Sequence, residues 1–93
     1  MRDLILFSRQ GCCLCEGLEE RLRAIDLQQL KLRLVVLDID APDCSPELRA
    51  RYDLQVPVLG LENAVLPRVS PRLSGDGLRN WLYQACSSPE GSD

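Results

Sequence analysis

The sequence predicts an α/β fold whose strands and helices follow the order β-α-β-α-β-β-α. Short apolar runs alternate with segments in which apolar residues recur every three or four positions, the patterns of buried strands and amphipathic helices. A strand, a helix and a second strand come first, and this order favours a parallel pair joined by a crossover helix. Two later strands lie close together in the chain and favour a hairpin. We therefore expect a four-stranded mixed sheet flanked by helices.

The first half of the chain supplies the parallel pair. Residues 3–8 are continuous in Leu, Ile and Phe, as expected for a strand that is covered on both faces. Residues 13–28 follow as one helix, and residues 32–39 form a second apolar strand. The helix carries charged residues on one side and, on the other, the apolar residues Leu14, Leu18, Leu22 and Ile25.

Two helices are predicted in the second half. Ser45 is a suitable N-cap and Pro46 a suitable first residue for a short helix over residues 46–52. Residues 74–85 form the last helix, whose apolar face comprises Leu78, Trp81, Leu82 and Ala85. Residues 87–93 are small and polar, so we expect a disordered C-terminal tail.

The hairpin lies between these two helices. Residues 56–61 and 64–69 are the predicted third and fourth strands, with the turn at Glu62-Asn63. Pro67 falls within the fourth strand and has no N–H to donate to a neighbour. The fourth strand should therefore be an edge strand.

Length and composition indicate a single soluble domain over residues 1–86. The chain has 93 residues, of which 45% are hydrophobic and 27% charged, enough to bury one core. No apolar run reaches the ~18 residues that would span a bilayer, and no signal-peptide pattern is present, so we expect a cytoplasmic protein. The net charge of −3, with scattered Arg and Lys, argues against nucleic acid or a membrane surface as a partner. We expect the protein to act as a monomer.

Three of the five cysteines lie within four residues, directly after the first predicted strand. Cys12 and Cys15 are three positions apart at the start of a predicted helix, so their sulfurs can bond without moving the backbone. The N–H groups and partial positive charge of the helix N-terminus stabilise a thiolate on Cys12, and a thiolate is the nucleophile in disulfide exchange. The spacing therefore predicts a redox-active dithiol, and the clustering of the cysteines fits a reducing cytosol.

A CxxC pair can also be half of a zinc site, which needs a second Cys or His pair at a distance. The chain has no histidine, and Cys44 and Cys86 stand alone, 29 and 71 residues after Cys15. We therefore expect no metal and no bound cofactor.

These motifs resemble those of glutaredoxin-like proteins, which have the thioredoxin fold. The resemblance rests on the run Cys12-Cys13-Leu14-Cys15 after the first strand, Val56-Pro57 at the head of the third, and residues 78–82 in the last helix. The chain is most similar to a small bacterial and plastid-type group with a cysteine-histidine-leucine-cysteine site, whose second strand ends in the run found here as Asp38-Ile39-Asp40. The resemblance covers residues 1–86.

The resemblance assigns roles to individual residues. It implies that Cys12 is the nucleophile and Cys15 the more buried resolving thiol, which releases the substrate from a mixed disulfide. It also implies a cis peptide bond before Pro57, which would turn Val56 outward to pair with a substrate strand. Alternatively, Pro57 only begins a strand.

Glutathione is the co-substrate that the resemblance implies. Arg9 matches the cation, and Val56 and Pro57 the strand, with which glutaredoxins hold glutathione. Gly75 and Asp76 could present backbone N–H groups to a carboxylate at the start of the last helix, but they could equally serve only to cap that helix. This turn is not the double-glycine turn of the family, and Leu14 replaces its aromatic residue.

Two further thiols have open roles. Cys13 takes the place of the more usual His, Pro or Gly, and it could compete as a nucleophile, bind a cluster shared between two subunits, or be a neutral spacer. Cys44 follows the second strand and should lie at the same end of the sheet as Cys12. It could form a secondary or regulatory disulfide, or be an inert small residue.

The sequence therefore predicts a thiol–disulfide oxidoreductase that uses Cys12 and Cys15 to reduce protein disulfides or glutathione mixed disulfides. Glutathione or a thioredoxin-type reductase would be its electron partner. The alternative is a non-catalytic thioredoxin-fold module, either an iron–sulfur cluster carrier or a redox-sensing, partner-binding domain.

Overall fold

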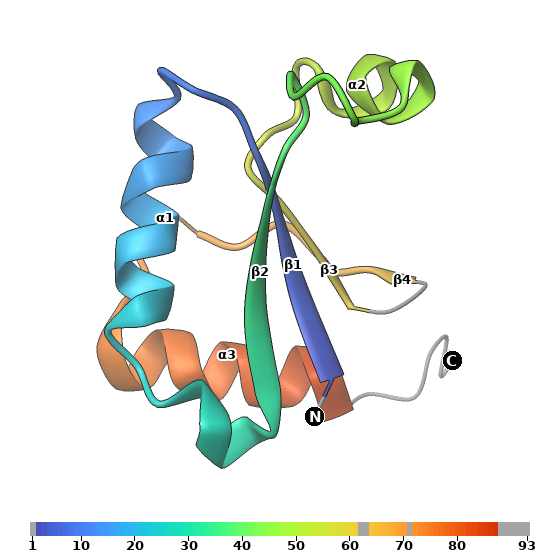
Figure 1. Ribbon diagram of the computed structural model, residues 1–93. Helices are drawn as coiled ribbons and strands as arrows, with labels where there is room; N and C mark the ends of the chain where they lie inside the picture. Colours follow the sequence, from blue (N-terminus) through green and yellow to red (C-terminus); the bar gives the residue numbers. More distant parts are fainter. Residues whose placement is uncertain (1, 62–63, 71, 88–93) are drawn as a thin grey trace.

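The protein has a mixed α/β fold, as predicted (Figure 1). The structure is a computed structural model that describes residues 2–61, 64–70 and 72–87. Its elements are, in order, β1 (Arg2–Ser8), α1 (Cys13–Arg23), the 3₁₀ turn η1 (Leu27–Leu30), β2 (Leu32–Asp38), α2 (Pro46–Tyr52), β3 (Val58–Leu61), β4 (Ala64–Val65) and α3 (Gly75–Ser87). The strands lie in the order β2-β1-β3-β4; β1 is parallel to β2, and β3 is antiparallel to both of its neighbours. Among the described residues, no helix is both long and apolar enough to cross a bilayer.

The first helix is shorter than the periodicity of the sequence predicts. α1 ends at Arg23 instead of continuing to residue 28, and a separate 3₁₀ turn follows. The side chain of Asp26 accepts a hydrogen bond from the N–H of Gln28 at 3.1 Å, and so caps the new turn. Asp competes in this way with the hydrogen bonds of a continuing helix, which is why the apolar spacing alone overestimates its length.

The hairpin strands are also shorter than predicted. β3 begins at Val58, because Pro57 has no N–H and the N–H of Val56 donates to the carbonyl of Tyr52 at 3.1 Å. Just after β4, the N–H of Leu66 donates a hydrogen bond to the carbonyl of Leu59 at 2.9 Å. Pro67, which has no N–H, follows directly after this bonded residue. The fourth strand is thus confined to Ala64–Val65 instead of residues 64–69, and it lies at the edge of the sheet.

The other elements agree with the prediction to within one or two residues: β1 begins one residue earlier than predicted and β2 ends one residue earlier. α2 spans the predicted residues 46–52, with the hydroxyl of Ser45 accepting the N–H of Leu48 at 3.2 Å. α3 runs to Ser87, one residue into the segment expected to be a tail. The predicted turn at Glu62-Asn63 and the remaining tail, residues 88–93, lie outside the described residues.

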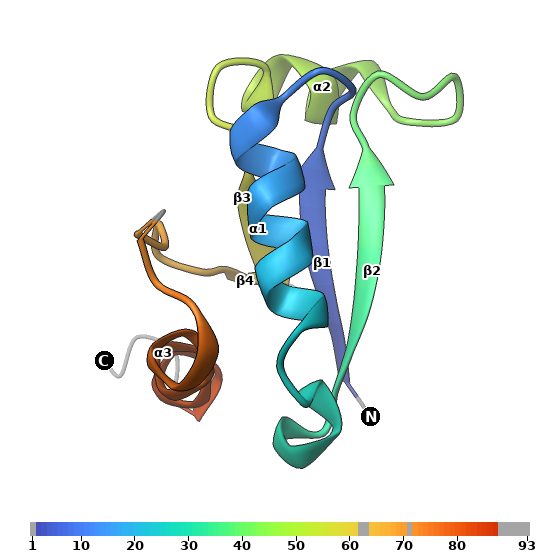
Figure 2. The ribbon, with the colours of Figure 1, turned by 90° about the vertical axis from the view of Figure 1, so that its left-hand side faces the viewer.

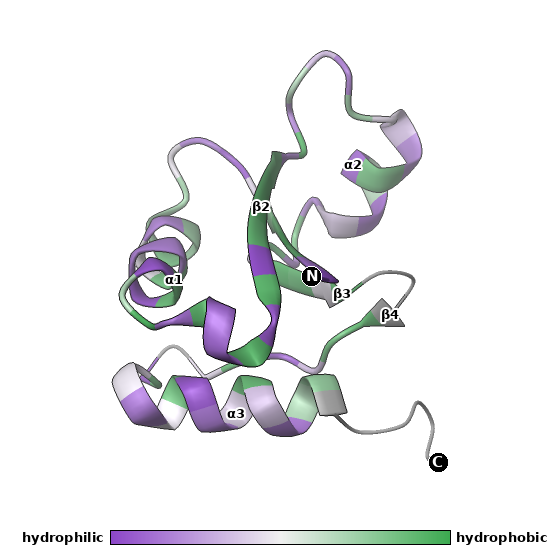
Figure 3. Ribbon diagram, turned by 60° about the horizontal axis from the view of Figure 1, so that its bottom comes forward, coloured by the Kyte–Doolittle hydropathy of each residue, from purple (hydrophilic) through white to green (hydrophobic). Residues whose placement is uncertain are grey.

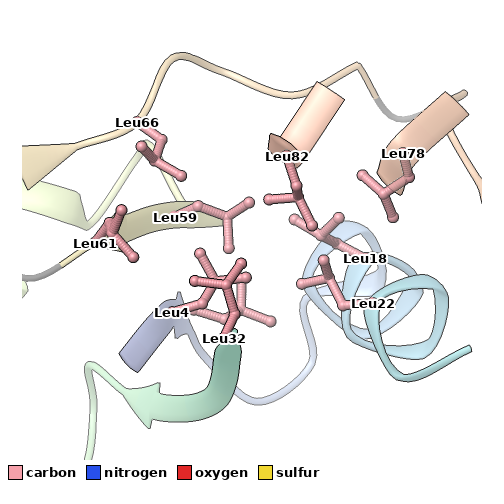
Figure 4. Close-up of a cluster of buried hydrophobic side chains, with 10 residues drawn as sticks. Leu4, Leu18, Leu22, Leu32, Leu59, Leu61, Leu66, Leu78 and Leu82 are labelled. Carbon is pink, nitrogen blue, oxygen red and sulfur yellow. The ribbon is translucent and has the colours of Figure 1, made fainter. Parts of the chain in front are cut away.

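The core is divided by the sheet into two clusters. Alternate residues of β1 point to opposite faces, so Leu4 and Leu6 face α1 and α3, whereas Phe7 faces α2. On the first face, leucines from three strands and two helices meet (Figure 4). In Figure 3, α3 alternates hydrophobic and hydrophilic residues along its length, as expected for a helix with one buried face. The second cluster comprises Phe7, Ile39, Cys44, Tyr52 and Val58.

The topology brings three loops to one end of the sheet. β1 and β2 are parallel and in register from Arg2 opposite Leu32 to Ser8 opposite Asp38, so both end at the same edge. β3 runs the opposite way and begins there. Figure 2 shows β1 and β2 pointing toward the end where α1 begins and α2 lies. The loops after β1, after β2 and before β3 therefore meet at this end.

Candidate redox site

The start of α1 holds the cysteine pair. Gly11 has a φ of +80°, a conformation that glycine adopts readily, and it turns the chain from β1 into the helix. Cys12 follows as the N-cap with extended backbone, and its Sγ accepts a hydrogen bond from the N–H of Cys15 at 3.1 Å. The helix thus directs an N–H group and its positive end at the sulfur of Cys12, an arrangement that stabilises a thiolate.

Cys12 and Cys15 are joined by a disulfide, with their Cα atoms 5.2 Å apart. The two sulfurs differ in access, because Cys15 is fully buried and Cys12 is only half-buried. The residues between them point outward: Cys13 is an exposed free thiol, and Leu14 is 56% exposed. An incoming group can therefore approach Cys12 and not Cys15.

The residues before β3 form the other side of the site. The Val56–Pro57 peptide bond is cis. Pro57 and Leu14 line the same hollow of about 130 Å³, which places this loop beside the residues that separate the two cysteines. Val56 is half-buried, and its N–H is already used by Tyr52, so pairing through that N–H would require the internal bond to open.

Arg9 joins the three loops at this end of the sheet. Its Nε and Nη2 donate to the two carboxylate oxygens of Asp40, after β2, at 3.0 and 2.9 Å. Its Nη1 donates to both the backbone carbonyl and the carboxylate of Asp53, at the end of α2, at 2.8 Å each. Arg9 is the residue that the resemblance to glutaredoxins assigns to glutathione, and here its three nitrogens all have partners within the protein.

These hydrogen bonds shift the pKa values of Arg9 and Asp40. The bonds to Asp40 and Asp53 raise the pKa of Arg9 further above its usual range. The bonds from Arg9 lower the pKa of Asp40, and the charges of Arg9 and Arg49 act in the same direction. Both shifts favour the charged forms, so the interaction between Arg9 and Asp40 is one between two ions at neutral pH.

The remaining predicted residues lie in three different places. Gly75 and Asp76 open α3, where Asp76 lies 3.9 Å from Arg79, and neither lines the two described hollows that Pro57 borders. Cys44 is at the same end of the sheet as Cys12, but it is buried against Phe7 and Tyr52 beneath α2. Burial raises the pKa of Cys86, a half-buried thiol near the end of α3.

Two residues at this end of the molecule, Asp53 and Arg68, are not indicated by any pattern in the sequence. The role of Asp53 as a partner of Arg9 depends on where α2 ends. Arg68 follows the edge strand and donates to the carbonyl of Gln55 at 3.2 Å. Asp40 is part of the Asp-Ile-Asp run, and the parallel register of β1 and β2 could have placed it near Arg9.

A mixed β-sheet flanked by helices, with a CxxC disulfide at the start of the first helix, is the arrangement of a thioredoxin-like redox module. The chain matches the model of the glutaredoxin-like domain family (DUF836) over residues 3–83, and it belongs to that family. A search of curated protein sequences finds no match. A solved structure titled "Structure of a malarial protein" is similar with a TM-score of 0.60 and 16% identity, over 91% of this chain and 97% of that one. At this identity the similarity shows the fold alone.

Proposed function

We propose that the protein is a thiol–disulfide oxidoreductase that reduces disulfides in proteins or in glutathione mixed disulfides. The observation that carries this proposal is the difference in access between the two bonded sulfurs. Cys12 is accessible at the helix N-terminus, whereas Cys15 is fully buried one turn further along. This is the arrangement that an exposed nucleophile and an internal resolving thiol require.

The reaction begins with the reduced protein. The thiolate of Cys12 attacks one sulfur of the substrate disulfide; a mixed disulfide forms, and the other substrate sulfur leaves as a thiolate and takes up a proton. The thiolate of Cys15 then attacks the sulfur of Cys12 and releases the second substrate thiol. Two electrons and two protons have passed to the substrate, and the protein is left with the Cys12–Cys15 disulfide.

A thiol donor must return the protein to its reduced form. Two glutathione thiols, or the dithiol of a thioredoxin-type reductase, would reduce the Cys12–Cys15 disulfide by the same exchange in reverse. The loop that contains Pro57 lies beside this site and would hold the substrate segment. A reducing cytoplasm fits this assignment, because three of the cysteines are free thiols.

The midpoint potential of the Cys12/Cys15 couple tests the proposal. The protein is equilibrated in graded glutathione buffers, its free thiols are alkylated, and each cysteine is mapped by mass spectrometry. A reversible two-electron transition confined to these two residues, between about −180 and −280 mV, would support the proposal. If Cys13 or Cys44 pairs instead, the dithiol mechanism is wrong.

A trapping experiment checks the order of the two steps. Cys15→Ser should accumulate a mixed disulfide on Cys12, whereas Cys12→Ser should give none, and Cys13→Ser is the matched control that should still turn over. A protein that purifies brown without oxygen and loses its colour in Cys12→Ser would instead support the cluster carrier. A protein that oxidises reversibly but never turns over would support the redox-sensing domain.

A further inference from the structure

Two hollows lie next to one another on the β3 side of the disulfide, and together they are called the groove. One hollow of about 130 Å³ is bordered by Leu14 and Leu18 of α1, and a second of about 180 Å³ extends to Val65 of the edge strand. Both hollows are lined by Pro57, Arg68 and Val69, so they adjoin one another along this segment. The groove thus begins beside the residues that separate the two cysteines and ends at the edge of the sheet.

The lining of this groove is mostly apolar. Leu14 is 56% exposed and Val65 is 58% exposed, so each end offers an uncovered hydrophobic side chain. Exposed hydrophobic side chains gathered around one site are a feature of surfaces that bind other proteins. Glutathione has little apolar surface with which to use them.

The charges in the groove have one sign. Arg68 lines both hollows, Arg21 lines the first, and the described residues of the lining include no Asp or Glu. Arg68 donates to a backbone carbonyl, and within the described part of the chain it forms no ion pair. On the other side of α1, by contrast, a hollow toward β2 is lined by Glu16, Glu19 and Asp38 together with Arg9. The chain as a whole is acidic, so this basic groove is a local feature.

Arg9, the cation on the β2 side of α1, is not available to a ligand. Arg9 is held by Asp40 and Asp53, and together the three groups carry one positive and two negative charges. A carboxylate that approached Arg9 would meet two carboxylates already bound there. An anionic substrate is therefore directed to Arg68 and away from Arg9.

From these observations we infer that the substrate is a protein whose disulfide is flanked by apolar and acidic residues in an extended segment, and that this segment binds in the groove with a carboxylate at Arg68. The inference rests on the proposed function and names its substrate class. The electron transfer is the two-step exchange described above, with the substrate reduced by two electrons and the Cys12–Cys15 disulfide formed.

The test is a single-turnover reaction with defined peptides, which needs no knowledge of the natural reductant. Short peptides carry one cysteine as a mixed disulfide with 5-thio-2-nitrobenzoate, a chromophore that leaves when Cys12 attacks. One peptide has Leu and Asp beside the cysteine, a second has Leu and Lys, and glutathione carries the same adduct. Rates are measured with the reduced protein, and the rate of Cys12→Ser is subtracted because Cys13 also reacts.

The acidic peptide should react about three- to tenfold faster than the basic peptide, the range expected when one exposed ion pair is exchanged for a repulsion. It should also react faster than the glutathione adduct. Arg68→Glu should remove or reverse the preference, and Arg68→Gln should reduce it. Arg51→Glu, an exposed substitution on α2 with the same change in net charge, should preserve it.

The outcomes separate the inference from the function on which it rests. Equal rates for the two peptides, a faster glutathione adduct, or the same loss of preference in Arg51→Glu would overturn the inference while leaving an active exchange site. No release above the Cys12→Ser baseline with any probe would overturn both. The unfolding midpoint of each variant shows whether it is folded, and Arg68→Gln retains the test if Arg68→Glu is not.

Discussion

Leu22→Ala should be among the most destabilising single substitutions in this protein. Leu22 lies on α1, is completely buried, and packs in the leucine cluster between α1, α3 and the sheet. Truncating a fully buried leucine removes its hydrophobic contribution and leaves a cavity, at a combined cost of about 3–5 kcal/mol. Leu and Ala have similar helix propensities, so the change reports packing.

The magnitude follows from the size of the domain. A chain of 93 residues has a free energy of unfolding of about 5–14 kcal/mol, so this one change removes a large share of it. For a domain of this size, each 1 kcal/mol lowers Tm by about 4–8 °C, and the expected drop is about 12–40 °C. Urea unfolding and thermal scans of the disulfide-bonded protein, followed by circular dichroism, give both quantities.

Leu54→Ala is the matched control, because the same atoms are removed from a side chain that is 91% exposed. Its stability should change by less than about 0.5 kcal/mol. The reasoning is refuted if Leu22→Ala and Leu54→Ala lose similar amounts, or if Leu22→Ala loses less than about 1 kcal/mol. Either result would mean that α1 is not packed against the sheet as described.

Three further predictions concern single contacts. Ser45→Ala should lower the free energy of unfolding by about 1 kcal/mol, because it removes the N-cap of α2; no change by urea unfolding would count against that cap. The pKa of Asp40 is lowered in the folded state, so its interaction stabilises the fold above its unfolded pKa and is lost as the pH falls through the lower folded value. Arg9→Met removes this interaction, so its free energy of unfolding should fall less between pH 7 and pH 3 than that of the unchanged protein. Urea unfolding at the two pH values measures both decreases, and equal decreases would contradict the interaction between Arg9 and Asp40. Cys86 should react with iodoacetamide more slowly than the exposed Cys13, because burial raises the pKa of Cys86; mass spectrometry after timed quenching would expose the opposite order.

The sequence predicts the helices and strands well where a pattern is reinforced by a local signal. α2 matches residues 46–52 because Ser45 and Pro46 mark its start by their own chemistry. α1 is overestimated because apolar spacing continues past Arg23, whereas the cap at Asp26 starts a new turn. Hydrophobic periodicity shows that a helix exists more reliably than it shows where the helix ends.

The candidate site shows the same difference between local and distant information. Cys12 and Cys15 are three residues apart, so the geometry of one helical turn is enough to predict that they pair. The interaction of Arg9 with Asp53 spans 44 residues and depends on the end of α2. The groove depends on Arg68 following a strand that stops after two residues, which composition and spacing do not determine.

Complete burial of Cys15 limits how electrons enter and leave the protein. Of the two bonded sulfurs, only that of Cys12 is within reach of another molecule, so an electron donor and an electron acceptor must occupy the same place at different times. A protein that reacts through this pair follows ping-pong kinetics, because the Cys12–Cys15 site cannot hold the donor and the acceptor in one ternary complex. An excess of either partner would therefore inhibit the other competitively, and the rate in a cell would depend on the ratio of the two partners as well as on their amounts.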